Sequence, residues 1–536
     1  MPLEDSTLRF LGKTLHAFLA KTLCAAYFFI LLGGVALTQR PPNAQFLTSG
    51  DLNVVVSQQG EATQGTPEQN PDKQSRSQDN SASTEEKPLS PQSAKALFRS
   101  VDELLKFASD DTGMPVKHEV KRKLTSRKEV ESYLEKGMRD DQDAKRLERS
   151  SEVLKKFGLI PRDFQLGPFL VTMLKEQVAG YYDPKKKTVN ILNWVDADQQ
   201  KPVLAHELTH ALQDQSYDMQ KWMKEAETEG DKKNDPTPAD IDTDEESDAR
   251  EAVVEGQAMV VMMDYTLAST GKKLVDMPQI GDAMKQGMLD GPDSPTFRNA
   301  PIFLREELTF PYRYGMDFTL ALEKAGGPEL GFAGPFRDPP KTTREIMEPE
   351  TYLSHEKLEP VKRLDFKTDF EHYDTFDIGA IGEFDVDVLV EQYAGAKEAE
   401  ALYPSWRGGY YFAGRAKGVK SGPLGVLYVS RWATPEKAAE FAAVYARSLA
   451  ERYQKRDALG ADGKVADDAP PVDSWKTLRG RHAWMTEEGA VVIEVRGDAV
   501  LVSESLDDET TKRTETDFWG GEVQSQESEV KSQNSN

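Results

Sequence analysis

The segment His206-Glu207-Leu208-Thr209-His210 constrains the fold of this chain more than any other feature of its sequence. The residues around it are mostly apolar and follow a helical pattern, so we expect the segment to lie in the middle of a helix. Residues four apart on an α-helix share one face and are separated by ~6 Å along the axis, so both imidazoles project in the same direction. Two histidines and a glutamate among buried-type residues require polar partners. The chain must therefore pack a second polar element against this face.

The two histidines have the spacing of metal ligands. Two ring nitrogens on one helix face can reach a single zinc ion at ~2.0–2.1 Å. Glu207, next to the first ligand, can accept a proton from a bound water. With seven histidines in 536 residues, such a segment arises by chance in on the order of one in a hundred chains of this composition. The sequence therefore predicts one Zn²⁺ ion bound by His206 and His210, with Glu207 as the general base.

A third protein ligand is expected from a later helix. Residues 211–217 contain neither Gly nor His, so no third histidine follows the motif directly. The next strong helix is expected from about residue 248 to 268, and Glu255 lies there among apolar residues, where an unpaired carboxylate is costly but a metal-bound one is not. We favour Glu255 as the ligand. Glu251, one turn earlier on the same face, could be the ligand instead or could support a histidine, and Asp248 could accept a hydrogen bond from a ligand imidazole.

The motifs HELTHALQDQ and VEGQA, together with FGLIPRDF, EQVAGYYDP and FPYRYG, resemble gluzincins, the thermolysin-like group of zinc metallopeptidases. The match covers roughly residues 165–265, and a wider stretch, about 95–505, resembles uncharacterised exported bacterial members of that group. The resemblance implies His206 and His210 as zinc ligands, Glu207 as general base and Glu255 as third ligand. It also implies a β-hairpin, here around residues 181–192, whose edge can pair with an extended substrate.

The sequence departs from that group in two places. The interval between His210 and Glu255 is longer than in thermolysin, and a charge-dense insertion at residues 225–247, expected to be a surface loop, accounts for the difference. The tyrosine or histidine that stabilises the transition state in the group has no clear match. Tyr312 and Tyr314 are the candidates for that role, although tyrosines beside proline and glycine often serve only in packing.

The order of sequence patterns predicts an α+β protein. Residues 91–165 are expected to form a helical N-terminal region, whose basic run at 121–123 would lie on a solvated helix face. Residues 166–360 are expected to form a zincin-like, mainly helical catalytic domain with a small β-hairpin or sheet. Residues 361–507 are expected to form a small α+β module, because two β-rich stretches there flank a helix.

The two ends of the chain are expected to lie outside the folded domains. Basic residues precede an apolar run at 22–38, which predicts a signal peptide in residues 1–40 or, because 17 apolar residues approach the length of a bilayer span, an uncleaved signal anchor. Residues 41–90 are polar and predict a disordered linker, and 508–536 predict a disordered tail. The protein is therefore expected to be exported, either periplasmic or extracellular, and membrane-anchored if residues 22–38 are retained. Cys24 is the only cysteine, which excludes an intramolecular disulfide.

The overall charge favours a protein or peptide partner. Lys and Arg total 67 against 91 Asp and Glu, so the net charge of −24 argues against nucleic-acid binding. The expected function is hydrolysis of peptide bonds in a peptide or protein substrate by a zinc-bound water that Glu207 activates.

Two other interpretations remain open. The chain could be a non-catalytic cell-envelope binding protein with a structural or vestigial zinc site, in which case His118, His355, His372 or His482 could fill the fourth coordination position. In the other interpretation, residues 91–165 are a pro-segment that blocks the cleft and is released by cleavage near Pro161.

Overall fold

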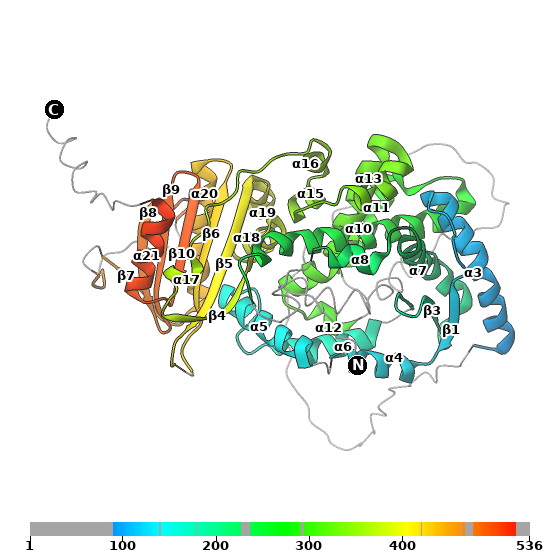
Figure 1. The fold of residues 1–536 in the computed structure, drawn as a ribbon, viewed down its shortest axis with the longest axis horizontal. Helices are drawn as coiled ribbons and strands as arrows, with labels where there is room; N and C mark the ends of the chain where they lie inside the picture. Colours follow the sequence, from blue (N-terminus) through cyan, green and yellow to red (C-terminus); the bar gives the residue numbers. More distant parts are fainter. Residues whose placement is uncertain are drawn as a thin grey trace, which may run out of the picture.

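The computed structural model describes residues 89–138, 141–177, 180–226, 236–290, 294–419, 421–460, 463–466 and 475–520. The expected signal or anchor, the linker up to residue 88 and the tail after residue 520 lie outside these residues. The structure is α+β, as predicted. It consists of a helical body carrying a three-stranded sheet and, at the other end, a seven-stranded sheet with its own helices (Figure 1).

The elements before residue 360 form the helical body. They are α3 (Pro91–Thr112), β1 (Lys121–Thr125), α4 (Arg127–Met138), α5 (Asp141–Phe157), α6 (Leu166–Gln177), β2 (Tyr181–Asp183), β3 (Thr188–Leu192), α7 (Ala197–Tyr217), α8 (Met219–Lys224), α10 (Asp240–Leu267), η2 (Ala268–Thr270), η3 (Leu274–Asp276), α11 (Pro278–Asp290), α12 (Pro295–Arg298), α13 (Ile302–Pro328), η4 (Glu329–Ala333), α14 (Gly334–Arg337), α15 (Thr343–Met347) and α16 (Pro349–Leu353). Helices α3 and α10 pack against α7, and α13 packs against α10, so α7 lies at the centre of this body.

The elements after residue 360 form the C-terminal module. They are α17 (Phe366–Asp369), β4 (Tyr373–Ala380), α18 (Glu383–Ala394), α19 (Ala396–Leu402), η5 (Tyr403–Ser405), β5 (Trp406–Ala416), β6 (Gly425–Trp432), α20 (Pro435–Arg452), β7 (Arg456–Leu459), β8 (Gly480–Thr486), β9 (Gly489–Arg496), β10 (Ala499–Glu504) and α21 (Asp508–Trp519). The strands form one antiparallel sheet in the order β4-β5-β6-β10-β9-β8-β7.

Both faces of the middle of the large sheet are buried. Successive residues of β5, such as Tyr411 and Phe412, point to opposite faces and belong to two separate apolar cores. Helices α18 and α20 cover the first face, while the second core includes Phe370 after α17 and Phe518 of α21. The central strands are therefore apolar at consecutive positions rather than at alternating ones.

The three-stranded sheet carries the predicted hairpin. Strand β2 pairs antiparallel with β3, and β1 pairs with the other edge of β3 in parallel, giving the order β1-β3-β2. Lys121–Lys123 therefore lie in a strand, and their expected position on a helix face is wrong. Lys121 and Lys123 alternate with Arg122, whose guanidinium binds Asp102 of α3 at 2.8 Å. This leaves β2 as the edge that faces α7.

Three boundaries differ from the sequence-based expectation. A proline is favoured in the first turn of a helix, which predicts a helix start at Pro202, but α7 begins at Ala197, because the side chain of Asp196 caps the amides of Asp198 and Gln199. Helix α10 begins at Asp240, so the last residues of the expected surface loop are helical. The tail expected to be disordered from residue 508 begins with α21, whose Phe518 is buried. In each case tertiary packing or a cap outweighs the local pattern.

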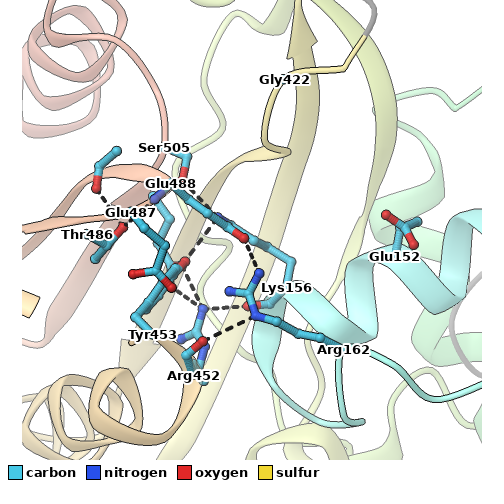
Figure 2. Close-up of polar contacts among 12 residues, drawn as sticks. Glu152, Lys156, Arg162, Gly422, Arg452, Tyr453, Thr486, Glu487, Glu488 and Ser505 are labelled. Atoms are coloured by element: carbon cyan, nitrogen blue, oxygen red, sulfur yellow. Dashed lines mark hydrogen bonds and ion pairs between the residues drawn. The ribbon is translucent and has the colours of Figure 1, made fainter. Parts of the chain in front are cut away.

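A buried network of charges joins the helical body to the C-terminal module. Lys156 of α5 donates to Glu488 and Ser505, both at 2.8 Å, and Arg162 forms a second ion pair with Glu488 (Figure 2). The guanidinium of Arg452 donates to the main chain of Lys156 and to both oxygens of Glu504. The module is thus held to the body by charged side chains, of which Lys156, Arg452 and Glu504 are almost fully excluded from solvent while Glu488 and Arg162 are partly exposed.

No helix within the described ranges combines the length and the hydrophobicity that crossing a bilayer requires.

Candidate metal centre

Helix α7 is fixed at its N-terminal end to the small sheet. The amide side chain of Gln200 accepts a hydrogen bond from Leu192 N at 2.9 Å and donates to the carbonyls of Leu192 and Val195 at 3.0 and 2.9 Å. These three hydrogen bonds join the end of β3 to the first turn of α7. From Val203 to Asp214 every residue of α7 is buried, so the histidine motif lies inside the body.

Helix α10 brings Glu255 to the motif through a close helix crossing. A Cβ atom on Gly256 would lie 2.0 Å from the backbone of Gly315 in α13, and a Cβ on Gly315 would lie 2.0 Å from the carbonyl oxygen of Ala252. Only glycine at both positions allows α10 and α13 to approach this closely. The glycines of VEGQA and FPYRYG thus position the residues beside them, which include Glu255 and Tyr314.

His206, His210 and Glu255 form one compact group. The His206 and His210 Nε2 atoms are 3.1 Å apart, and Glu255 Oε2 lies 3.2 Å from His206 Nε2 and 3.6 Å from His210 Nε2. The ligand atoms of a tetrahedral metal ion with bonds of ~2.0–2.2 Å are ~3.3–3.6 Å apart. The triangle therefore has the size that one such ion needs, and this group could hold a metal ion.

The donor set also fits a metal. Each side chain is at most 3% exposed. Two ring nitrogens that face each other cannot both act as hydrogen-bond donors in that contact, because neither would then find an acceptor in the other. Among the described residues these three form the only close group of three or more His, Cys, Asp or Glu side chains. His118, His355, His372 and His482 lie outside it, so the group that could hold an ion has three members among the described residues.

Glu207 is held between α7 and the edge of the small sheet. Its Oε2 accepts a hydrogen bond from the backbone N–H of Tyr182 in β2 at 2.6 Å. Its Oε1 is buried without a hydrogen-bond partner in the part of the chain that the structure describes. Burial raises the pKa of Glu207 to about 7. The side chain is thus a buried carboxyl group, restrained by one backbone donor, with one oxygen available.

The pKa values of the other titratable groups in the cluster show why the Glu255 carboxyl group is ionised. Burial opposes ionisation of Glu255, but the imidazoles of His210 and His206 outweigh burial and lower the pKa of Glu255. Burial likewise works against protonation of His210, but the Glu255 carboxylate dominates and raises the pKa of His210 to about 9. Burial lowers the pKa of His206. The centre therefore pairs the anionic carboxylate of Glu255 with positive charge. A metal cation bound there can supply that positive charge instead.

Gln213, which the sequence analysis did not single out, orients His210. Its Oε1 lies 2.9 Å from His210 Nδ1, and its Nε2 donates to the carbonyl of Val254 and to Gln257 Oε1, both at 3.0 Å. Gln257 in turn donates to the backbone carbonyls of Gly331 and Phe332. This chain leaves Nε2 of His210 directed at Glu255. The signal in the sequence is a glutamine three residues after the second histidine and another two residues after Glu255.

The structure separates the alternative ligands from Glu255. Glu251 is buried on α10 but does not belong to the group that could hold an ion. Asp248 was a candidate partner for a ligand imidazole, but the acceptor beside His210 is Gln213. Asp248 instead lies near Glu245, whose pKa is raised by burial and by neighbouring carboxylates that include Asp248.

The two candidate tyrosines lie in different surroundings. The ring of Tyr312 stacks near His206, with ring centroids 6.4 Å apart and planes at 27°. The hydroxyl of Tyr314 is directed at Asp387 of α18, 3.4 Å away. Tyr312 is therefore the tyrosine that borders the metal group, whereas Tyr314 connects α13 to the C-terminal module.

No family model, curated protein or solved structure matches this chain. The function of the candidate site is therefore interpreted from its own geometry.

Proposed function

We propose that this protein is an exported zinc-dependent metallopeptidase, with His206, His210 and Glu255 as the ligands of one Zn²⁺ ion and Glu207 as the general base. The observation that carries the proposal is the triangle of ligand atoms from two helices, with edges of 3.1, 3.2 and 3.6 Å. Zinc hydrolases use three protein ligands and keep a fourth position for water, whereas structural sites fill all four. Three ligands and no fourth among the described residues support a catalytic site.

The surrounding architecture supports a zincin-like domain of the gluzincin type. Helix α7, which carries His206 and His210, packs against the small sheet, and Glu255, the proposed third ligand, comes from the later helix α10. Residues 91–165 supply α3, which packs on α7, and β1, which pairs with β3. This packing supports their being part of the folded body rather than a removable pro-segment.

Each residue at the site then has a distinct task. His206, His210 and Glu255 would hold a zinc ion, which would lower the pKa of a coordinated water and polarise the substrate carbonyl. Glu207 accepts a proton at Oε1, the oxygen without a hydrogen-bond partner among the described residues, and passes it to the leaving amine. The edge of β2 offers backbone groups to an extended peptide, and the stacking of Tyr312 near His206 supports Tyr312 as the side chain that contacts the reacting carbonyl.

Because the site is buried, this mechanism requires the site to open, and a site that stays closed would favour a non-catalytic protein. Glu207 is fully buried and the ligands are nearly so, so a peptide reaches them only when the elements packed around the centre move apart. A site that never opened would fit the second candidate, a cell-envelope binding protein with a structural or vestigial zinc site. The two candidates differ in turnover, not in zinc content.

Glu207→Gln tests the proposal. The substitution removes the proton acceptor and keeps the size of the side chain, so zinc content should stay at one ion per chain while cleavage of a peptide library falls by ~10²–10⁴. Glu103→Gln, which changes an exposed residue of α3, is the matched control and should cleave like the parent. Absence of cleavage by the zinc-loaded parent, or equal cleavage by the Glu207 variant, would contradict the proposal.

A further inference from the structure

A polar cavity of about 710 Å³ opens beside the metal centre, at the C-terminal end of α7. Its walls come from the end of α7, helix α8, the β2–β3 hairpin, the segment before β1 and Phe336 of α14. This volume lies within the range of pockets that bind small ligands or large side chains.

Tyr182 forms the partition between the cavity and the metal centre. Its backbone N–H binds Glu207, while its hydroxyl, on the cavity side, donates to Asp214 Oδ2 at 2.8 Å. Glu207 and Asp214 are seven residues apart on α7, which is two turns or ~10.5 Å. An extended peptide rises ~3.3 Å per residue, so the cavity lies about three substrate residues from the scissile bond.

Three residues that line the cavity carry buried polar atoms without a hydrogen-bond partner among the described residues. They are Asp214 Oδ1, Ser216 Oγ and Trp222 Nε1. Asp214 Oδ2 is already bound by Tyr182 and by Lys187 Nζ at 2.5 Å, so Oδ1 remains as an acceptor. A carboxylate oxygen and a hydroxyl can accept from N–H donors, and the indole N–H can donate to a carbonyl.

The aromatic side of the cavity favours a planar cation. Tyr217 and Phe336 stack with ring centroids 4.1 Å apart and planes at 6°. Four carboxylates line the cavity, those of Glu119, Asp214, Asp218 and Glu225, against two lysines. A guanidinium has five donors in a plane and stacks on aromatic faces, so it matches both the unpartnered acceptors and the aromatic wall.

We propose that this cavity is a substrate subsite that binds an arginine side chain, and less tightly a lysine side chain, about three residues from the cleaved peptide bond. The inference builds on the proposed peptidase function and names the substrate class that the site prefers. Asp214 Oδ1 accepts hydrogen bonds from the guanidinium and Trp222 Nε1 donates to a peptide carbonyl; because both atoms are buried, the wall of the cavity must open for these contacts to form.

Peptide binding can be measured without cleavage in the zinc-loaded Glu207→Gln protein. The probes are alanine-based decapeptides that carry one arginine, citrulline or glutamate at the same position, titrated by calorimetry. Citrulline has the shape of arginine without its charge, so the arginine peptide should bind at least about tenfold more tightly, as expected for ~1.4 kcal/mol from a charged hydrogen bond. Equal binding of the three peptides would overturn the inference.

Asp214→Asn locates the effect. Asparagine preserves an acceptor for Tyr182 but removes the charge, so the preference for arginine over citrulline should fall to nearly one. Asp198→Asn removes an exposed charge from the first turn of the same helix and should leave the preference intact. Glu225→Gln, at an exposed rim position, should reduce the preference partly, which keeps the test valid if the Asp214 variant unfolds.

The outcomes separate this inference from the proposed function. Arginine preference in binding without any cleavage by the zinc-loaded parent would leave the subsite in place and contradict the peptidase. Cleavage by the parent with no preference for arginine three residues from the cleaved bond would leave the peptidase in place and contradict the subsite.

Discussion

Two buried clusters of charged side chains differ in how many of their polar atoms have hydrogen-bond partners. In the network between the helical body and the C-terminal module, both oxygens of Glu504 receive hydrogen bonds, from Arg452, Tyr445 and Tyr453, at 2.6–2.8 Å. In the centre on α7 and α10, two imidazole nitrogens face each other across 3.1 Å, and Glu207 retains an oxygen without a partner among the described residues.

The difference indicates which cluster needs a ligand. Burying charge is costly unless charge and hydrogen bonds are balanced. Lys156 and Arg452 balance the charge of Glu488 and Glu504, and only Nε of Arg452 lacks a hydrogen-bond partner among the described residues, so that network serves to join two parts of the fold. The side chains of His206, His210 and Glu255 converge on a single point. This arrangement suits a bound cation better than it suits hydrogen bonds among the three side chains. Four perturbations distinguish these two interpretations.

The largest effect is expected from Glu504→Gln. Removing one partner of a buried ion pair leaves Arg452 without a counter-charge and should lower the free energy of unfolding by ~3–5 kcal/mol, measured by urea unfolding. Zinc content should not change. Glu451→Gln, at an exposed position next to Arg452, is the control. A loss below ~1 kcal/mol would mean that the network does not hold the module.

Glu255→Gln should have the next largest effect. Zinc binding by protein sites is worth ~10–16 kcal/mol over about four ligands, so the loss of one ligand should weaken zinc binding by roughly 3 kcal/mol, or more than about 100-fold. Glu251→Gln should bind zinc within about threefold of the parent, because Glu251 lies outside the ligand group. The zinc affinities of the two variants are measured by chelator competition. If Glu251 were the ligand, the Glu251→Gln protein would bind zinc weakly and the Glu255→Gln protein would bind it like the parent.

Metal removal should destabilise one cluster only. At a free zinc concentration 100 times the dissociation constant, binding to the folded state adds ~2.7 kcal/mol, so chelation should lower the unfolding free energy by about that amount. His210→Ala should abolish this dependence on zinc, whereas Glu504→Gln should retain it. Identical unfolding curves with zinc and with chelator would contradict a metal at this centre.

The smallest of the four effects is expected from Gln213→Ala. Gln213 orients His210 without touching the ion, and loss of such a residue typically weakens metal binding by ~10–100-fold. Gln199→Ala, a change of the same residue type at an exposed position of the same helix, should have no effect. Equal zinc affinity of the Gln213→Ala protein and the parent would contradict this orienting role.

The sequence predicts the parts of this molecule that are set by local spacing. The helix that carries His206 and His210, the hairpin at 181–192 and the two β-rich stretches that flank a helix in the C-terminal module are confirmed, because helical and β periodicities extend over many residues there, whereas β4 and β7 lie outside the predicted stretches. The sequence also favours Glu255 over Glu251, since its neighbours are more apolar, and the structure brings Glu255 to the histidines.

Contacts between distant segments could not be predicted in this way. The start of α7 depends on a cap by Asp196 that a proline six residues later obscures, and β1 forms because β3 offers an edge for parallel pairing. Gly256 and Gly315 are ordinary glycines in the sequence, and only the helix crossing shows why they are needed. Gln213 belongs to the site through contacts with α10, which no local pattern predicts.

X-ray absorption at the zinc edge of the zinc-loaded protein tests the metal centre most directly. We expect one zinc per chain, with two imidazole nitrogens at ~2.0–2.1 Å, a carboxylate oxygen at ~2.0–2.2 Å and one further oxygen from solvent. Glu255→Gln should change this spectrum, and Glu207→Gln should not. A spectrum with four protein ligands, with fewer than two imidazoles, or with no zinc bound would contradict the assignment.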